Sequence, residues 1–411
     1  MVATGDLPIL AIMHSADSVG LFDLAEAAAG CCQIVFVIDG TPSMTRPLLR
    51  FGPVADITGL SDSAAAARVS DLAPDGITTF TDAHLPRTAA LADALILPFH
   101  SPEVAAVLVD KYRQRQALHR AGLPGPRFCL VELGDRAFDT LVGDMEFPVV
   151  VKPSVGAASR EVTMAVDGEQ LIEAMAQARV AGFGAMVVEE FLPDSEEAMN
   201  ADFASFVSVE SVMGGGQLRH LAVMSKLPLA PPFRETGHVT PSHLPTAMVK
   251  EVLDVVTAAI AGIGIVVGGL HTEVKLTPSG PRIIEVNGRP CGMPEVLSAA
   301  GGCSLIEAAM RVALGEAPSD EGLFPCDRVG YRINLQPPMS AHRVGTIEGL
   351  EVVGDLPGVL SVKLRRRPGD AVDWRLGTDE QVLNVVGAAD SLDEVHAMRR
   401  QVAATVSISY D

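Results

Sequence analysis

Residues 270–290 read LHTEVKLTPSGPRIIEVNGRP, and this stretch decides the fold. Two runs of alternating or apolar residues, 270–276 and 282–287, flank the segment TPSGP at 277–281. Proline, serine and glycine are strong turn formers, so the segment between the runs favours a tight reversal of the chain. The pattern therefore predicts an antiparallel hairpin.

Two carboxylates face each other in such a hairpin. If it is symmetric about Ser279, Glu273 lies directly opposite Glu285, with Cβ atoms about 5 Å apart. Asn287 is two residues beyond Glu285 and therefore shares its face. Like charges directly opposite each other need a neutralising partner, and two carboxylates with an amide oxygen suit Mg²⁺, with Mn²⁺ as an alternative. The other interpretation is a solvated hairpin face with ordinary glutamates.

Lysines give a second signal. Only six of the 31 Lys and Arg residues are lysines, and a retained lysine can mark a place that needs a compact ammonium. Lys152 ends an apolar run and is followed by SVGAAS (154–159), small residues whose backbone N–H groups can approach phosphate oxygens. Lys111 and Lys226 lie in two further blocks. Taken singly, Lys111 and Lys226 fit a surface position better, and the loop after Lys152 fits an ordinary hairpin better, but together the lysines supply the positive charge that a triphosphate requires.

Composition excludes several classes of function. The chain of 411 residues has a formal net charge of −20, and its one basic run is Arg365 to Arg367, which disfavours a nucleic-acid partner. The first residues lack a basic n-region and carry an apolar run of only strand length, so neither a signal peptide nor a membrane span is predicted. Six cysteines without a CxxC pair indicate a reducing compartment. We therefore expect a cytoplasmic protein.

The length requires several domains, because single cores stop growing well below 411 residues. Apolar runs at 8–13 and 33–38 flank an Ala-rich helical pattern, and 94–97 is a further candidate strand. These elements predict a first domain of βαβ type. It lacks a GxGxxG after the first strand, so a dinucleotide site is not supported there. One helix is expected to run from about residue 103 to Gly122.

The rest of the chain mixes helices and strands. A strand, a small-residue loop and a strand are expected over 147–166, and a hairpin is expected around Gly214 to Gly216. The final ~90 residues predict a small α+β domain. The other expected elements are helices at 169–180, 247–262 and 391–403 and strands ending at Leu192 and spanning 205–213, 217–226, 330–335 and 359–366.

The sequence resembles the ATP-grasp ligases, and in particular the L-amino acid ligases that make dipeptides. The resemblance runs from about Asp110 to Met293. It is carried by several blocks in the right order: DKYRQRQALHRAGLPGPR, FPVVVKPSVGAASREV, VVEEFLPDSEE, FVSVESVMGGG, MSKLPLAPPFRETGHVTPS and HTEVKLTPSGPRIIEVNGRP.

The resemblance implies a nucleotide site and a metal site. Lys111 and Lys152 would contact the phosphates of ATP, and Lys226 would meet the γ-phosphate. The loop would contribute Ser154, Gly156 and Ser159, and the adenine would be held by Glu190, Phe191 and Leu192 with the Glu189 side chain nearby. Glu196 would hold the ribose, with Glu197 as the alternative because the usual glycine before this acid is absent. Glu273, Glu285 and Asn287 would bind two Mg²⁺.

The resemblance also implies the catalytic residues. His238 and Glu235 would line the substrate pocket, although a histidine taken alone is more often structural. Arg289 would stabilise the acyl-phosphate and the tetrahedral intermediate. His271 shares a face with Glu273 and would also touch phosphate. Met293 stands where the bacilysin-type ligases carry a tryptophan, which suggests a roomier acceptor pocket.

The implied fold is α/β with α+β parts: an ATP-grasp fold after a Rossmann-like domain. We expect domains at 1–108 (Rossmann-like), 109–186 (central lid), 187–322 (catalytic) and 323–411 (small, α+β). The implied reaction is ATP-dependent joining of an amino-acid or carboxylic-acid donor to an amine acceptor, both small molecules, with a homodimer by family analogy. The alternatives are a biotin-carboxylase-like or purine-pathway ATP-grasp enzyme and an inactive nucleotide-binding module.

Overall fold

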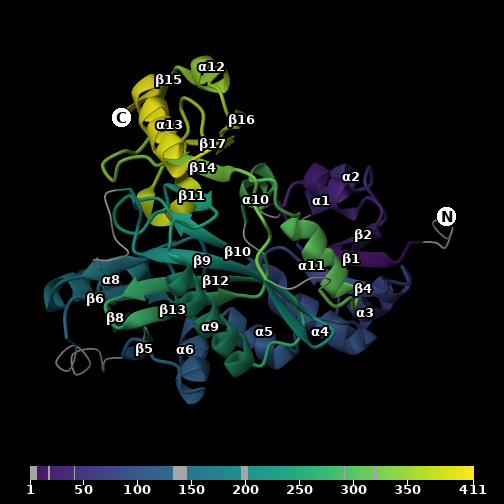
Figure 1. The fold of residues 1–411 in the computed structure, drawn as a ribbon. Coiled ribbons are helices and arrows are strands. Elements are labelled where there is room, and N and C mark those ends of the chain that lie inside the picture. Colours follow the sequence, from purple (N-terminus) through teal and green to yellow (C-terminus); the bar gives the residue numbers. More distant parts are fainter. Residues whose placement is uncertain are drawn as a thin grey trace.

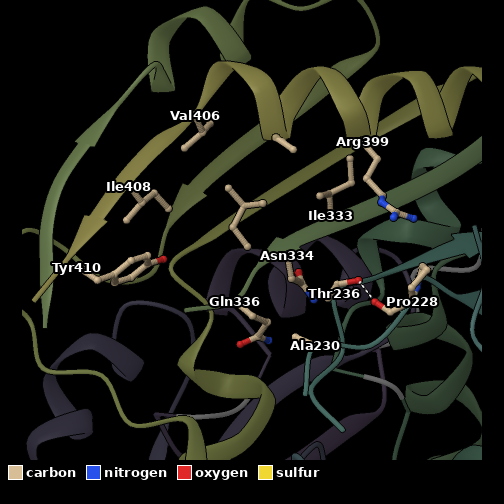
Figure 2. Close-up of a pocket in the computed structure, with 12 residues that line it drawn as sticks. Pro228, Ala230, Thr236, Ile333, Asn334, Gln336, Arg399, Val406, Ile408 and Tyr410 are labelled. Atoms are coloured by element: carbon tan, nitrogen blue, oxygen red, sulfur yellow. Dashed lines mark hydrogen bonds between the residues drawn. The ribbon is translucent and has the colours of Figure 1, made fainter. Parts of the chain in front are cut away.

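The computed structural model describes residues 7–16, 19–40, 42–132, 146–195, 202–290, 292–318 and 322–411. Their strands form four sheets of four, eight, two and four strands. Figure 1 shows the N-terminal sheet and the sheet of β6 and β8 on opposite sides of the large sheet, with α13 and its neighbours above. No helix of the described residues is long and apolar enough to cross a membrane.

The N-terminal sheet is parallel, in the order β3-β2-β1-β4. Its central strands are buried on both faces, which explains why they read as continuous apolar runs. The predicted strand at 94–97 is wrong: this stretch ends α4, and Ile96 adopts a left-handed conformation with 93% of its side chain exposed. The elements are β1 (Ile9–Met13), α1 (Leu21–Ala28), β2 (Gln33–Ile38), α2 (Thr45–Leu48), β3 (Val54–Asp56), α3 (Asp62–Ser70), β4 (Gly76–Thr79), η2 (Asp82–His84) and α4 (Leu85–Leu95).

The single helix expected from residue 103 to Gly122 is two helices, α5 (Pro102–Leu108) and α6 (Lys111–Arg120). Asp110 breaks them apart, because its carboxylate accepts hydrogen bonds from the backbone N–H groups of Tyr112 and Arg113 and so begins a new helix. This N-cap fixes Lys111 at the first position of α6.

A four-stranded antiparallel sheet, in the order β5-β8-β6-β7, carries the small-residue loop between β6 and β7. The predicted strand, loop and strand over 147–166 are confirmed. The elements are β5 (Phe128–Glu132), β6 (Val149–Pro153), β7 (Thr163–Ala165), α8 (Gly168–Val180) and β8 (Ala185–Glu190).

The eight-stranded sheet runs β13-β12-β9-β10-β11-β14-β17-β16. One face packs on α9 (Thr246–Ile263) through an apolar cluster that includes Val207, Val209 and Leu270. The sheet continues from β11 to β14 across the predicted boundary between 322 and 323. Its strands are β9 (Phe206–Gly214), β10 (Gln217–Lys226), β11 (Gly237–Thr240), β12 (Gly268–Thr277), β13 (Gly280–Asn287), β14 (Val329–Leu335), β16 (Val359–Leu364) and β17 (Leu383–Ala389).

The hairpin of β12 and β13 confirms the predicted pairing of Glu273 with Glu285, but reaches it differently. The turn is tighter than expected, since Thr277 pairs with Gly280. A bulge at Ile284 then shifts the register by one residue and restores the pairing at the acids. Arg115 donates a 2.7 Å hydrogen bond to the bulged carbonyl of Ile284.

The remaining helices and strands connect the sheets. Helix α11 packs its residues Ile306, Ala309 and Met310 into the core of the N-terminal sheet, so that sheet is anchored by a helix from much later in the chain. The elements are α10 (Glu295–Ala299), α11 (Leu305–Ala313), β15 (Val344–Glu348), α12 (Leu350–Gly354), η3 (Trp374–Glu380), α13 (Leu392–Thr405) and β18 (Ser407–Tyr410), with η1 (Pro42–Met44) in the first domain.

Candidate active site

One face of the large sheet carries most of the charged and amide side chains of strands β13 to β17, while the other face carries much of the apolar core. Side chains alternate between faces, and directly paired residues share a face. The pairing of His271 with Glu210, of Lys226 with His238 and of His238 with Arg332 therefore puts these groups on one surface. The residues of this polar face are Glu285, Asn287, His271, Glu273, Ser208, Glu210, Lys226, His238, Arg332, Asn334 and Asn384.

The two facing carboxylates each have a cationic neighbour. Lys111 Nζ lies 2.9 Å from Glu285 Oε1, and His271 Nε2 lies 3.5 Å from Glu273 Oε1. His271 Nδ1 also makes a 2.7 Å hydrogen bond with Glu210. Burial alone would lower the pKa of His271, but Glu210 and Glu273 outweigh burial and raise it to about 9. His271 is therefore an imidazolium at neutral pH and partly neutralises the pair.

The residues predicted to bind metal form a hard oxygen cluster. Asn287 Nδ2 donates a 3.4 Å hydrogen bond to the carbonyl of His271. This bond leaves the amide oxygen of Asn287 as the atom that can ligate a metal ion. Over the described ranges no three His, Cys, Asp or Glu side chains are grouped as a ligand set. A bound Mg²⁺ would thus depend on two carboxylates, one amide oxygen and phosphate oxygens, a donor set that suits a hard ion.

Lys152 lies in a buried ion cluster with Glu189 and Arg115. The Lys152 ammonium contacts Glu189 Oε1, and Arg115 donates from Nε to Glu189 Oε2 at 2.8 Å. Burial alone would raise the pKa of Glu189, but Arg115 and Lys152 outweigh it and lower it to about 2. Burial lowers the pKa of Lys152, against the opposing effect of Glu189. The cluster contains two cations and one carboxylate, so one positive charge remains for a phosphate.

The small-residue loop lies against the first turn of α6. Lys111 Nζ donates to the carbonyl of Gly156 at 2.5 Å, and Lys111 N donates to Ser154 O at 2.8 Å. Ala158 and Ser159 adopt positive φ angles of 58° and 56°, which L residues rarely do. The loop is therefore held in an unusual conformation beside a lysine.

The predicted adenine segment follows β8 directly. Glu190 N and Phe191 N are bonded to Arg127 O and Pro148 O, so the segment is tied into the sheet. Lys275 Nζ lies 5.7 Å from the centre of the Phe191 ring. Leu192 is half-buried. The predicted ribose acids, Glu196 and Glu197, lie outside the described residues.

Lys226 forms the second buried cluster, with Glu235 and His238. Lys226 Nζ lies 2.8 Å from Glu235 Oε1, and His238 Nε2 lies 3.3 Å from Glu235 Oε2. Burial alone would lower the pKa of Lys226, but Glu235 and Glu273 raise it. Burial and the neighbouring Lys226 lower the pKa of His238 to about 4. At neutral pH this cluster thus holds a charged lysine, a charged glutamate and a neutral histidine.

Arg289 is held by a residue that the sequence did not point to. Arg289 donates from Nε at 3.0 Å and from Nη2 at 2.7 Å to the same oxygen of Asp82, Oδ2. Asp82 lies in η2, directly after β4 of the N-terminal sheet. Its position after a strand of a parallel sheet was the available signal, because ligands of such sheets bind beyond the carboxyl ends of the strands.

Two further groups were missed. Arg332 on β14 pairs with His238 and donates to Glu295 Oε1 at 3.0 Å and to Asn334 Oδ1 at 2.8 Å. Gln114 on α6 uses its amide to pair with both backbone groups of Val286, at 2.7 and 2.9 Å, and so covers the open edge of the sheet. Strand periodicity in 329–335 was the one signal for Arg332, and Gln114 had none.

The structure brings the predicted residues into neighbouring clusters on two sheets. Glu273, Glu285, Asn287 and His271 lie together, and Lys111 joins them to the loop. The assigned roles in binding and catalysis stay predictions.

Comparison with known proteins identifies the fold. Residues 145–295 match the family model described as an ATP-grasp domain. The chain is 26% identical to alanine–anticapsin ligase of Bacillus subtilis (strain 168) over 232 residues, which cover 53% of this chain and 49% of that protein. It is 28% identical to carnosine synthase 1 of Homo sapiens over 280 residues, 62% of this chain and 32% of that one.

A solved structure resembles the whole chain. The crystal structure of an L-amino acid ligase from Bacillus licheniformis superposes with a TM-score of 0.79 at 22% identity, covering 99% of this chain and 100% of that one. This likeness confirms the predicted ATP-grasp fold. The chain spans only about half or less of the two named curated relatives.

Proposed function

The chain carries an ATP-grasp domain, and we propose that it is an ATP-dependent ligase that joins a carboxylate donor to an amine acceptor, both amino-acid-like, through an acyl-phosphate. The observation that carries the proposal is the pairing of Glu273 with Glu285, with His271 and Lys111 as their cationic neighbours. Facing carboxylates cost stability in a hairpin unless a ligand or cation uses them.

ATP would lie between the four-stranded sheet that contains β6 and β8 and the eight-stranded sheet. Lys152, backed by Arg115 and Glu189, supplies one net positive charge, and Lys111 supplies another beside the loop. The loop contributes Ser154, Gly156 and Ser159. The adenine would lie at Glu190, Phe191 and Leu192. Converging positive charge neutralises a triphosphate and lowers the barrier to phosphoryl transfer.

Glu273, Glu285 and Asn287 would hold Mg²⁺, which when bound neutralises charge that develops on the phosphates. Lys226 supports the γ-phosphate from the neighbouring part of the same face. Because its pKa is raised, Lys226 stays charged throughout the neutral range.

In the first step, the donor carboxylate attacks the γ-phosphorus and ADP leaves, which gives the acyl-phosphate. Glu235 and His238 line the donor pocket, and Glu235 keeps its negative charge because Lys226 and His238 hold its pKa well below the usual range, although burial opposes them. A fixed carboxylate there can orient a donor ammonium.

In the second step, the acceptor amine attacks the acyl carbon, phosphate leaves with the C–O bond electrons, and the amine loses a proton. Arg289 stabilises the oxyanion of the tetrahedral intermediate. Asp82 fixes the guanidinium through two hydrogen bonds to one oxygen. Met293 follows Arg289 and would border the acceptor.

The names of the relatives support this substrate class: one is a ligase of alanine and anticapsin, one a carnosine synthase, and the structural neighbour an L-amino acid ligase. The cytoplasmic location and the homodimer stay predictions. A biotin-carboxylase-like or purine-pathway chemistry would instead require bicarbonate or formyl phosphate.

The test is ADP and phosphate release with Mg²⁺-ATP across a matrix of amino acids, singly and in pairs. Release that requires two substrates, with a new amide found by mass spectrometry, supports the ligase. Turnover with bicarbonate alone would contradict it and favour the carboxylase-like alternative.

A further inference from the structure

A segment near the C-terminus, η3, is bonded to the small-residue loop between β6 and β7 (residues 154–162), called the phosphate loop below because the proposed function places ATP phosphates there. Thr378 N donates to Ala158 O at 2.8 Å, and Glu161 N donates to Arg375 O at 2.8 Å. The two partners are more than 200 residues apart in the sequence. These bonds join the loop between β6 and β7 to a region outside the matched ATP-grasp domain.

The contact is close enough to require a glycine. Gly377 has a φ of 79°, and a Cβ added there would lie 2.1 Å from Ala158 O and 2.8 Å from Arg160 N. Two independent constraints, the left-handed backbone and the close approach of the loop, therefore exclude a side chain. The loop and η3 are packed backbone to backbone.

The part of the loop that contacts η3 has an unusual backbone conformation. Ala158, Ser159 and Glu161 all have positive φ, between 53° and 58°. Such conformations cost energy in L residues and persist when surrounding contacts hold them. The two hydrogen bonds to η3 are made by the first and the last of these three residues: Ala158 O accepts from Thr378 N, and Glu161 N donates to Arg375 O.

Thr378 also contacts Glu235, which belongs to the cluster of Lys226, Glu235 and His238. Its Oγ1 accepts a 3.1 Å hydrogen bond from Glu235 N, and its carbonyl accepts one of 3.0 Å from Gln336 Nε2. Gln336 Nε2 also donates to Glu235 O at 2.9 Å. Thr378 and Gln336 thus bind both backbone groups of Glu235, whose carboxylate holds Lys226.

We propose that Gly377 and Thr378 are positioning residues that couple the conformation of the phosphate loop to the placement of Glu235. Ordering of the loop on the nucleotide holds Ala158 O against Thr378 N, and the same residue fixes Glu235 for the donor substrate. ATP and donor therefore bind with positive cooperativity. The catalytic consequence rests on the proposed ligase function, whereas the physical link between loop and Glu235 does not.

The first part of the test breaks the loop contact. Gly377→Ala is compared with Gly369→Ala, a matched control with a φ of 93° and no atom within 4 Å of the added Cβ. The donors of the two bonds are Glu161 N and Thr378 N, so we expect hydrogen exchange of peptides covering residues 154–161 and 374–380 to be about tenfold faster in Gly377→Ala. The affinity for adenylyl imidodiphosphate should fall about tenfold. Gly369→Ala should match the wild type in both measurements.

The second part breaks the Glu235 contact and keeps the loop contact. Thr378→Val retains the backbone N–H but loses the hydroxyl, and Thr378→Ser restores it. We expect Thr378→Val to raise the KM for the donor about tenfold and to increase phosphate release per amide, with loop exchange unchanged. Thr378→Ser should recover the wild-type KM, a rescue that a purely structural role would not give.

Unchanged loop exchange and nucleotide affinity in Gly377→Ala would overturn the proposal, whatever the enzyme's reaction. Equal donor KM values in Thr378→Val and the wild type would overturn the coupling to Glu235. If no amide forms with any pair while loop exchange responds to Gly377→Ala, the ligase function fails and the loop contact stands.

Discussion

Lys152 and Lys226 are both almost completely buried, with 5% and 1% of their surface exposed, yet their pKa values move in opposite directions. Burial lowers the pKa of Lys152, whose carboxylate partner Glu189 is shared with Arg115. Lys226 pairs with Glu235, whose other close neighbour is His238, and Glu273 lies nearby; the two glutamates raise the pKa of Lys226 despite burial. The difference teaches that the charge balance of a cluster, rather than depth, decides how firmly a lysine keeps its proton.

The same balance suggests a division of roles. The Lys152 cluster has a surplus positive charge that a bound phosphate can satisfy, so it suits nucleotide binding. The Lys226 cluster is already balanced internally, and its lysine stays charged, so it suits the reacting γ-phosphate and the donor. The first two predictions below alter one of these balances, the third alters a separate ion pair, and the last concerns a histidine of the Lys226 cluster.

The largest effect is expected from Glu189→Gln. It leaves the buried cations Lys152 and Arg115 without a charged partner, and breaking a buried pair in this way costs about 3–5 kcal/mol. Urea unfolding should show this loss of stability. The control is Asp254→Asn, which breaks an exposed pair with Lys250 and should change stability by less than about 1 kcal/mol. Equal effects in both variants would refute the shared role of Glu189.

Substitution of Lys226 and of Lys152 should affect different kinetic constants. Lys226→Met should lower kcat about 10²- to 10³-fold with little change in the KM for ATP, because it removes charge stabilisation in the transition state. Lys152→Met should mainly raise the KM for ATP. Steady-state ADP release measures both. A larger rise of KM in Lys226→Met than in Lys152→Met would reverse the assignment.

Asp82→Asn tests a third ion pair, between the N-terminal sheet region and the segment after β13. The variant weakens the orientation of Arg289, so amide formation should slow about 10- to 100-fold while phosphoryl transfer persists. The ratio of amide to phosphate in the products measures this. An unchanged ratio at normal rates would mean that Asp82 does not position Arg289.

The last prediction concerns the pH dependence of stability. His238 has a pKa of about 4 in the folded protein, below the ordinary value of 6.5, so unfolding takes up a proton between these values. Its stabilising contribution is present above pH 6.5 and is lost as the pH falls towards 4. His238→Gln should reduce the slope of stability against pH in this window by about one proton, or about 1.4 kcal/mol per pH unit. Urea unfolding at several pH values measures the slope, and an unchanged slope would contradict a neutral His238.

Much of the hairpin was predictable because alternation with period two fixes which residues share a face. The pairing of Glu273 with Glu285 followed from that rule together with the assumption of a turn symmetric about Ser279. The bulge at Ile284 was not predictable, because it compensates a tighter turn and is held by Arg115 from a different helix. The tighter turn and the bulge each shift the register by one residue, in opposite directions, so the expected pairing of the two acids is retained.

The residues that the sequence did not reveal act through contacts distant in the chain. Asp82 meets Arg289 across 207 positions, and Thr378 meets Glu235 across 143. Periodicity carries no information at such separations. Strand β11 was missed because its four residues are too short for a recognisable pattern, although it joins Lys226 to the C-terminal strands.

The most direct test of the acyl-phosphate is the fate of oxygen in the donor carboxylate. A donor labelled with ¹⁸O in both carboxylate oxygens is converted with ATP and the acceptor, and the products are analysed by mass spectrometry. The proposed mechanism predicts one ¹⁸O in the released phosphate and one in the amide. Unlabelled phosphate, with both ¹⁸O atoms absent from it, would contradict the central claim that the carboxylate is phosphorylated before the amine attacks.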